Sequence, residues 1–168
     1  MSEPFHHAEP AETHAQLAAR YFKEGYNCAQ SVFAAFCDVT GLDFQTALRL
    51  SSSFGGGMGR LREVCGACSG LFMAAGMLYG YDDPENPSAK ASHYLRIQML
   101  ASEFRKRHGS LICRELLAEQ HPDATPNPTP RTEQFYQERP CARFVEDAAA
   151  ILDEWLQKEP PLNDANPS

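Results

Sequence analysis

Apolar side chains recur along most of this chain at intervals of three and four residues, the spacing of one face of an α-helix. No segment shows the alternation of period two, bounded by turn residues, that indicates a strand. The pattern therefore predicts an all-α protein. The expected helices run from about 17 to 24, 28 to 40, 43 to 52, 64 to 80, 88 to 108, 110 to 118 and 140 to 158.

The stretch 64–81 differs from the others because it carries no charged side chain. Its length reaches the roughly 18 apolar residues at which a membrane-spanning helix becomes a candidate. Glycines, among them Gly66 and Gly70, lower its hydrophobicity, and no second such segment exists to pack with it. We therefore expect a compact helical bundle around a buried central helix over about 64–80, whose glycines let neighbouring helices approach closely.

The length of 168 residues suits one domain. We place a single helical domain at 11–158, because 1–10 and 159–168 are rich in proline and polar residues without periodicity, as frayed tails are. A third irregular stretch, 121–139, is rich in proline and is expected to form a long surface loop within the domain.

The chain carries 15 basic and 22 acidic residues, for a net charge of −7. This balance argues against binding to nucleic acid through a broad basic surface. The first residues contain acid and proline and show no basic stretch followed by an apolar core, so no secretory signal is apparent. We expect a cytoplasmic protein that binds neither nucleic acid nor a membrane.

The six cysteines are too few for a disulfide scaffold in a chain of this size, and a reducing compartment would keep them as thiols. Four of them fall at the expected starts of separate helices: Cys28, Cys65, Cys113 and Cys141. A helix start offers unpaired backbone N–H groups and a partial positive charge, both of which stabilise a thiolate. The thiolate is the form that attacks disulfides and binds metals. We expect the four sulfurs to share one interior site.

Cys65 and Cys68 form a C-x-x-C unit whose sulfurs share one face of the central helix, as in dithiol motifs with an activated first thiol. Cys37 lies about half a turn out of register with Cys28, so the two face opposite ways. Cys37 is therefore expected to be a core thiol.

Other candidate motifs are weaker. The glycine-rich FGGGMGR at 54–60 lacks the Lys-Ser/Thr of a phosphate-binding loop and follows no strand. Arg60 and Arg62 are interpreted as surface cations rather than as partners of a thiolate. No histidine has the spacing of a metal motif, and no Ser-His-Asp or paired-carboxylate signature is present.

With these residues in place, the chain resembles the bacterial and archaeal family named for the pattern C-GCAxxG-C-C. The resemblance rests on GYNCAQSVFAAF at 25–36, FGGGMGRLREVCGACSGLFMAAGMLYG at 54–80, EFRKRHGSLICRELL at 103–117 and RPCARFVEDAAAILDEWL at 139–156. The family's cysteines correspond to Cys28, Cys65, Cys113 and Cys141, and its central glycines to Gly66 and Gly70. Cys-Gly-Ala stands where the family pattern has Gly-Cys-Ala, and Cys37 and Cys68 are additions.

The resemblance implies an all-helical fold and a redox role, with an iron–sulfur cluster as a candidate cofactor. In a first hypothesis, Cys28, Cys65, Cys113 and Cys141 hold a [2Fe–2S] cluster or one tetrahedral metal for electron transfer or redox sensing. In a second hypothesis, Cys65 attacks a disulfide, and Cys68 or another of the four family cysteines then resolves the mixed disulfide. In a third, the chain is a non-catalytic helical interaction module. The partners expected are a redox partner protein and, as a further candidate, a second copy of the chain in a homo-oligomer.

Overall fold

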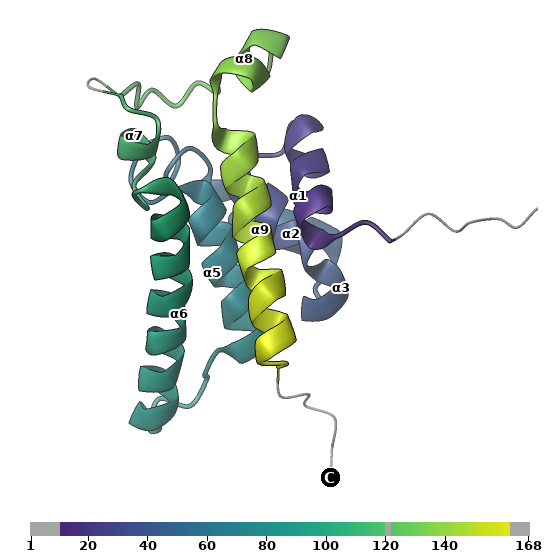
Figure 1. Ribbon diagram of the computed structural model, residues 1–168, viewed down its shortest axis with the longest axis vertical. Helices are drawn as coiled ribbons and strands as arrows, with labels where there is room; N and C mark the ends of the chain where they lie inside the picture. The colour runs from purple at the N-terminus through teal and green to yellow at the C-terminus, as the bar shows by residue number, and fades with distance from the viewer. Residues whose placement is uncertain (1–10, 120–121, 162–168) are drawn as a thin grey trace, which may run out of the picture.

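The computed structural model describes residues 11–119 and 122–161, and within these ranges its regular elements are helices (Figure 1). The β-type pairing described there is one isolated bridge, between Val64 and Ile112. The all-α prediction is therefore confirmed. The helices are α1 (His14–Lys23), α2 (Cys28–Ala35), α3 (Cys37–Thr40), α4 (Phe44–Ser51), α5 (Gly66–Tyr79), α6 (Pro87–His108), α7 (Cys113–Leu116), α8 (Glu133–Glu138) and α9 (Cys141–Lys158). Most of the two expected tails, 1–10 and 162–168, lies outside the described residues.

Capping side chains and glycines set the helix boundaries. The Asn27 side chain accepts from the backbone N–H of Gln30 at the start of α2, and the Gln30 side chain accepts from the N–H of Asn27. Gly41 and Gly109, at φ of 74° and 90°, end α3 and α6 in the left-handed conformation that glycine adopts at little cost. The single helix expected between Asn27 and Gly41 is interrupted at Phe36, where φ is −99° and ψ is 15°.

The central element of the bundle is α5. It packs against α2, α6 and α9, and Figure 1 shows it running between α6 and α9. The prediction of a buried glycine-rich central helix is confirmed. The buried residues of α5 are Gly66, Ala67, Cys68, Gly70, Leu71, Ala74 and Ala75. Among the described residues, no helix combines the length and apolar character needed to cross a membrane.

Two glycines determine how closely α5 approaches α2. A Cβ atom on Gly66 would stand 3.0 Å from the Cβ of Cys28, and one on Gly70 would stand 2.7 Å from the carbonyl oxygen of Ala29. Contacts this short would force the two backbones apart, because helix interfaces in protein cores are already close-packed. The expected close approach through glycine is confirmed at these positions, and it places the start of α5 beside the start of α2.

Three further segments differ from the expectation. The helix expected over about 110–118 is confined to α7, Cys113–Leu116. The stretch expected to be an irregular loop, 121–139, contains α8, whose N-terminus is capped by Thr132; residue 121 lies outside the described part. The central helix begins at Gly66 rather than at 64. The physical reason is that the backbone of 62–65 instead forms hydrogen bonds with that of 111–114.

Replacing Gly70 by alanine tests the contact between α5 and α2. We expect Gly70→Ala to lower the free energy of unfolding by roughly 1–3 kcal/mol, because the added methyl group overpacks against the carbonyl of Ala29. Gly76→Ala in the same helix is the matched control, since nothing lies within 4 Å of its Cβ position. There alanine should stabilise by about 0.5–1 kcal/mol. Urea denaturation measures both, and equal effects would contradict the role given to Gly70.

Candidate functional site

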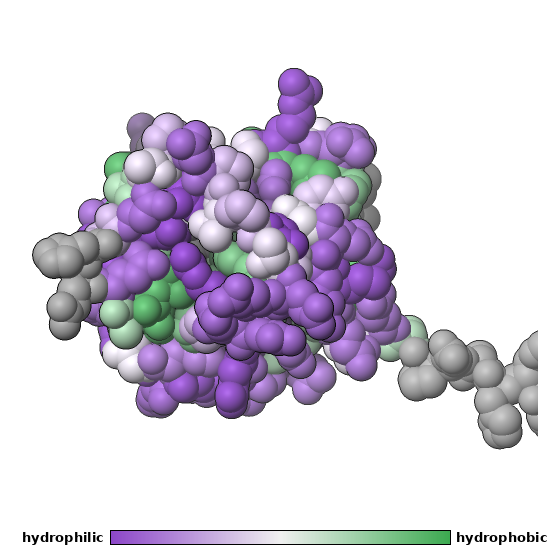
Figure 2. Space-filling model, turned by 90° about the horizontal axis from the view of Figure 1, so that it is seen from above, coloured by the Kyte–Doolittle hydropathy of each residue, from purple (hydrophilic) through white to green (hydrophobic). Residues whose placement is uncertain are grey.

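The four cysteines at helix starts all line one cavity of about 430 Å³. Cys28, Cys113 and Cys141 are the first residues of α2, α7 and α9, and Cys65 immediately precedes α5 as its N-cap. The helix-start placement predicted from the sequence is therefore found at all four. The cavity lies at the end of the bundle that carries α7 and α8, which Figure 2 shows from above as a largely hydrophilic surface with apolar patches between.

Main-chain hydrogen bonds bring Cys65 and Cys113 together. The N–H of Cys65 donates to the carbonyl of Leu111 at 2.8 Å, and the N–H of Cys113 donates to the carbonyl of Glu63 at 2.6 Å. These two bonds lie on either side of the bridge between residues 64 and 112. They hold the starts of α5 and α7 side by side, although the whole of α5 and α6 separates them along the chain.

Cys28 and Cys141 are neighbouring thiols, and each shifts the pKa of the other. The hydrogen bond from the Cys28 thiol is the largest influence that lowers the pKa of Cys141 to about 7. Burial opposes this shift, and the positive charges of Arg139, Arg131 and Arg62 add to it. The same hydrogen bond, followed by burial, raises the pKa of Cys28 well above its usual range. Cys141 is therefore the member of the pair that carries negative charge near neutral pH.

Cys65 and Cys68 form a second pair. The hydrogen bond from the Cys68 thiol lowers the pKa of Cys65, burial opposes the shift, and the backbone N–H groups of Ala67 and Cys68 add to it. The same side-chain hydrogen bond, followed by burial, raises the pKa of Cys68. Cys68 is fully buried and does not line the cavity, whereas Cys65 does. The C-x-x-C unit thus presents only its first sulfur to the cavity.

The remaining two cysteines are different from these pairs. Burial raises the pKa of Cys113 to about 11, with a further contribution from Cys65, while Arg62 partly offsets the shift. Cys37 lines a separate cavity beside His14. Cys37 therefore lies away from the other sulfurs, as its helical register predicts. Its side chain is half-buried, so it is not the fully buried core thiol that was expected.

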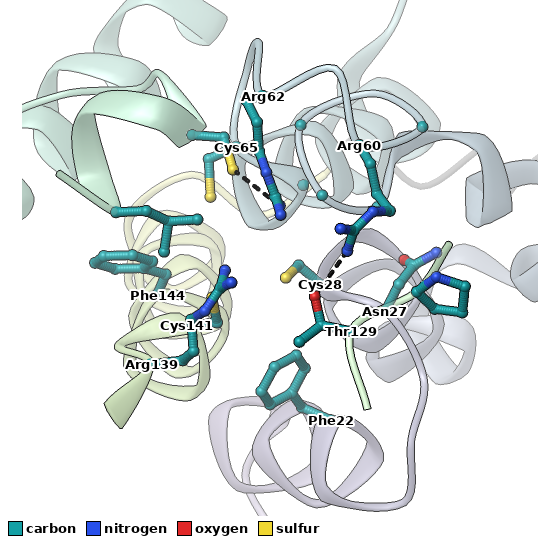
Figure 3. A pocket seen from close by; sticks show the side chains of 18 of the residues that line it. Phe22, Asn27, Cys28, Arg60, Arg62, Cys65, Thr129, Arg139, Cys141 and Phe144 are labelled. Atoms are coloured by element: carbon teal, nitrogen blue, oxygen red, sulfur yellow. Dashed lines mark hydrogen bonds between the residues drawn. The ribbon is translucent and has the colours of Figure 1, made fainter. Parts of the chain in front are cut away.

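Arg62 is buried beside the sulfurs, and its interpretation as a surface cation is wrong. The residue is 3% exposed. Because the backbone around it is hydrogen-bonded to that of 111–114, its guanidinium lies inside the protein, 4.0 Å from the sulfur of Cys113 and 3.5 Å from a carboxylate oxygen of Glu119. Figure 3 shows the guanidiniums of Arg62 and Arg139 directed from different walls into the same space as the Cys28 side chain.

Arg60 ties the segment after α7 to the rim of the cavity. Its Nη1 donates to the Oγ1 of Thr129 at 2.8 Å (Figure 3). Its Nε donates to the carbonyl of Thr125 at 2.8 Å, and its Nη2 to the carboxylate of Asp123 at 3.0 Å. The Arg60 side chain is 14% exposed, so it too departs from a freely solvated surface cation. These contacts make part of the proline-rich segment a wall of the site.

Sequence reasoning missed Arg131 and Arg139, which also line the cavity. Arg131 donates to the carbonyls of Phe22 and Tyr26 at 3.0 and 3.1 Å, and its guanidinium stacks 4.1 Å from the centre of the Phe22 ring. Both arginines lie in 121–139, the stretch that the sequence predicts to be an irregular loop. No local motif marks them, because their partners are far away in the sequence.

The cysteines as arranged do not fit a metal ion. Within 11–119 and 122–161, no group of three or more His, Cys, Asp or Glu side chains is close enough to hold one. A tetrahedral zinc or iron–sulfur site requires four such ligands around one centre. Instead, Cys28 and Cys141 shift the pKa of each other, as do Cys65 and Cys68, and Cys113 lines the same cavity. The predicted cluster or metal stays a prediction.

Residues 26–155 match the family model described as "Putative redox-active protein (C_GCAxxG_C_C)". The match includes all four cysteines that line the cavity and extends from the cap of α2 into the last turns of α9. Neither the curated proteins nor the solved structures yield a match to the chain.

The pH dependence of Cys141 alkylation tests the pairing with Cys28. The thiolate reacts, so alkylation should rise with pH and reach half its maximum near pH 7, the pKa of Cys141. Cys28→Ala removes the hydrogen-bond donor and should move this midpoint upward, toward the roughly 8.5 of an ordinary cysteine. Cys37→Ala, in the other cavity, should leave it in place. Residue-resolved mass spectrometry gives the rates. A wild-type midpoint near that of ordinary cysteine would show that the pairing does not activate Cys141.

Proposed function

The chain belongs to the C_GCAxxG_C_C family of redox-active proteins, and we propose that its redox step is thiol–disulfide exchange by Cys141 and Cys28. The observation that carries this proposal is that Cys28 and Cys141, each of which shifts the pKa of the other, line one cavity together with four arginine side chains. Exchange requires one thiolate with access to a disulfide and a second thiol beside it. Cys141 supplies the thiolate near neutral pH, and Cys28 keeps its proton until the second step.

The proposed reaction consumes an organic disulfide, RS–SR. The Cys141 thiolate attacks one sulfur of the substrate, a bond forms between them, and the other half leaves as RS⁻. This RS⁻ takes the proton of the Cys28 thiol. The Cys28 sulfur then attacks the Cys141 sulfur and releases the second RS⁻. Cys28 and Cys141 end as a disulfide, and the two electrons they lose have reduced RS–SR to RSH and RS⁻.

The surroundings of the pair suit the charges of this reaction. A thiolate leaves at each of its two steps, and the guanidiniums of Arg62, Arg131 and Arg139 already stabilise negative charge on Cys141. Cys141 is also the first residue of α9, where the partial positive charge of a helix N-terminus favours a thiolate. The positive charge is built into the wall of the cavity, so little rearrangement is needed as charge develops.

Cys65 and Cys68 are the second dithiol in the same region. The pKa of Cys65 is lowered as that of Cys141 is, but Cys65 is only 5% exposed and Cys68 is fully buried. Cys28 and Cys141 are both half-buried. We therefore place the first attack at Cys141 and assign to the C-x-x-C pair a later exchange with the disulfide formed there.

A cluster-bound form is the second candidate function, because all four family cysteines line one cavity. Electron transfer or redox sensing would then be its role, with Cys28, Cys65, Cys113 and Cys141 as ligands. Among the described residues, the sulfurs as they stand are not grouped closely enough to hold that cluster.

Brief treatment with a neutral disulfide such as bis(hydroxyethyl) disulfide tests the exchange reaction. We expect peptide mapping after acid quenching to find a Cys28–Cys141 disulfide as the first product. In Cys28→Ala the reaction should stop at a mixed disulfide on Cys141, which mass spectrometry detects as an added hydroxyethyl thiol group. Cys68→Ala should still form the Cys28–Cys141 bond. A first product confined to Cys65 and Cys68 would contradict the assignment of Cys141.

Anaerobic reconstitution with iron and sulfide separates the two candidate functions. Under the exchange proposal the protein stays colourless and all six thiols remain titratable. Visible charge-transfer absorption that disappears in each of Cys28→Ala, Cys65→Ala, Cys113→Ala and Cys141→Ala, but persists in Cys37→Ala, would instead establish the cluster.

A further inference from the structure

The cavity has the size and lining of a small-molecule site. Its volume of about 430 Å³ falls in the range of roughly 300–1,000 Å³ that ligand pockets occupy. Part of its wall is apolar and includes Phe22, Phe135, Phe144, Leu116 and Leu117. The sulfurs lie in this concave space rather than on a flat surface, which favours a small substrate over a disulfide in a folded protein.

The charge of the lining is of one sign. The charged side chains that line the cavity are Arg60, Arg62, Arg131 and Arg139, and among the described residues no carboxylate is part of the lining. The whole chain carries a net charge of −7, so this concentration of positive charge is local. Two acidic residues approach from outside the lining: Asp123 pairs with Arg60, and Glu119 lies near Arg62 and Arg139.

Among the arginines that line the cavity, Arg62 has buried nitrogens without a hydrogen-bond partner among the described residues. Its side chain is 4% exposed, and its buried Nε and Nη2 have no hydrogen-bond partner among the described residues. Glu119 lies 3.5 Å from Nε, which offsets charge on that edge only, and Nη1 reaches the sulfur of Cys113 at 4.0 Å. Leaving a buried charged donor unsatisfied is costly, so such a group calls for a partner. Figure 3 shows this guanidinium directed into the cavity.

We propose that the cavity binds a small organic disulfide bearing carboxylate groups, with one carboxylate on the guanidinium of Arg62 and the disulfide bond beside Cys28 and Cys141. This inference rests on the proposed exchange reaction and names its substrate class. A carboxylate beside this guanidinium would offset its positive charge and accept a charge-assisted hydrogen bond from it. Arg139, on another wall, attracts the same end of the ligand, and the aromatic and leucine side chains contact its hydrocarbon part.

Three disulfides of similar size and different charge test the proposal: dithiodipropionate is anionic, bis(hydroxyethyl) disulfide is neutral and cystamine is cationic. Oxidation of the wild-type protein should be fastest with the anionic compound and slowest with the cationic one. In Arg62→Gln, the ratio of the anionic to the neutral rate should fall about tenfold, the value of a lost charge-assisted hydrogen bond. Using the ratio removes any change in the reactivity of Cys141 itself.

Arg143→Gln is the matched control, because Arg143 lies on α9 near the site but its side chain is 81% exposed and does not line the cavity. It removes the same charge and should leave the ratio unchanged. An equal fall in both variants would overturn the proposal, since it would show a general field effect. If Arg62→Gln fails to fold by circular dichroism, Arg139→Gln replaces it, with a fall in the ratio expected and an unchanged ratio counting against the site.

A non-reactive analogue separates this inference from the exchange reaction. Suberate has nearly the length and both carboxylates of dithiodipropionate but no sulfur. Calorimetry should show that it binds the wild-type protein and binds Arg62→Gln about tenfold more weakly. If the neutral disulfide oxidises Cys141 but suberate does not bind and the three rates are equal, the substrate class is wrong and the exchange function survives. If suberate binds and no disulfide reacts, the exchange function fails and the anion site remains.

Discussion

The close approach of α5 to α2 is the constraint on which the site depends. Gly66 and Gly70 lack the Cβ atoms that would collide with Cys28 and Ala29, so the two helices pack almost backbone to backbone. This contact sets the starts of both helices next to each other and brings Cys65 to the cavity that Cys28 lines. The main-chain bonds between 62–65 and 111–114 then add Cys113. Loss of this close contact would therefore move the sulfurs of Cys28 and Cys65 apart.

Burial and charge act in opposite directions on these sulfurs, and the neighbours of each decide the balance. Burial alone raises the pKa of a thiol, as at Cys113. At Cys65 and Cys141 the pKa is lowered instead, because the neighbouring thiol of Cys68 or Cys28 acts against burial. In both pairs the donor keeps its proton and the acceptor carries the charge. A site built from two such pairs can hold thiolates in a half-buried space without a metal to neutralise them.

The arginines join this chemistry to the outer parts of the fold. Arg60 and Arg131 anchor the segment before α9 through hydrogen bonds to distant residues, and both guanidiniums also line the cavity. The same side chains thus build the wall and supply its positive charge. Arg62 differs because its charge is buried and two of its nitrogens have no hydrogen-bond partner among the described residues. The proposed anionic ligand would supply one.

The sequence alone determined most of the helices, though not α8 or the interruption at Phe36, and the positions of the four cysteines at helix starts. Helical periodicity, the Asn27 cap and the glycine ends are local signals, because they depend on residues within a turn or two of one another. Even the closeness of α5 to its neighbours was visible in its glycines. Only the tertiary structure decided which sulfurs pair, that Cys68 lies off the cavity, and that Arg62, Arg131 and Arg139 face it. Pairing and burial of charge depend on contacts between segments far apart along the chain, and no local pattern of residues records them.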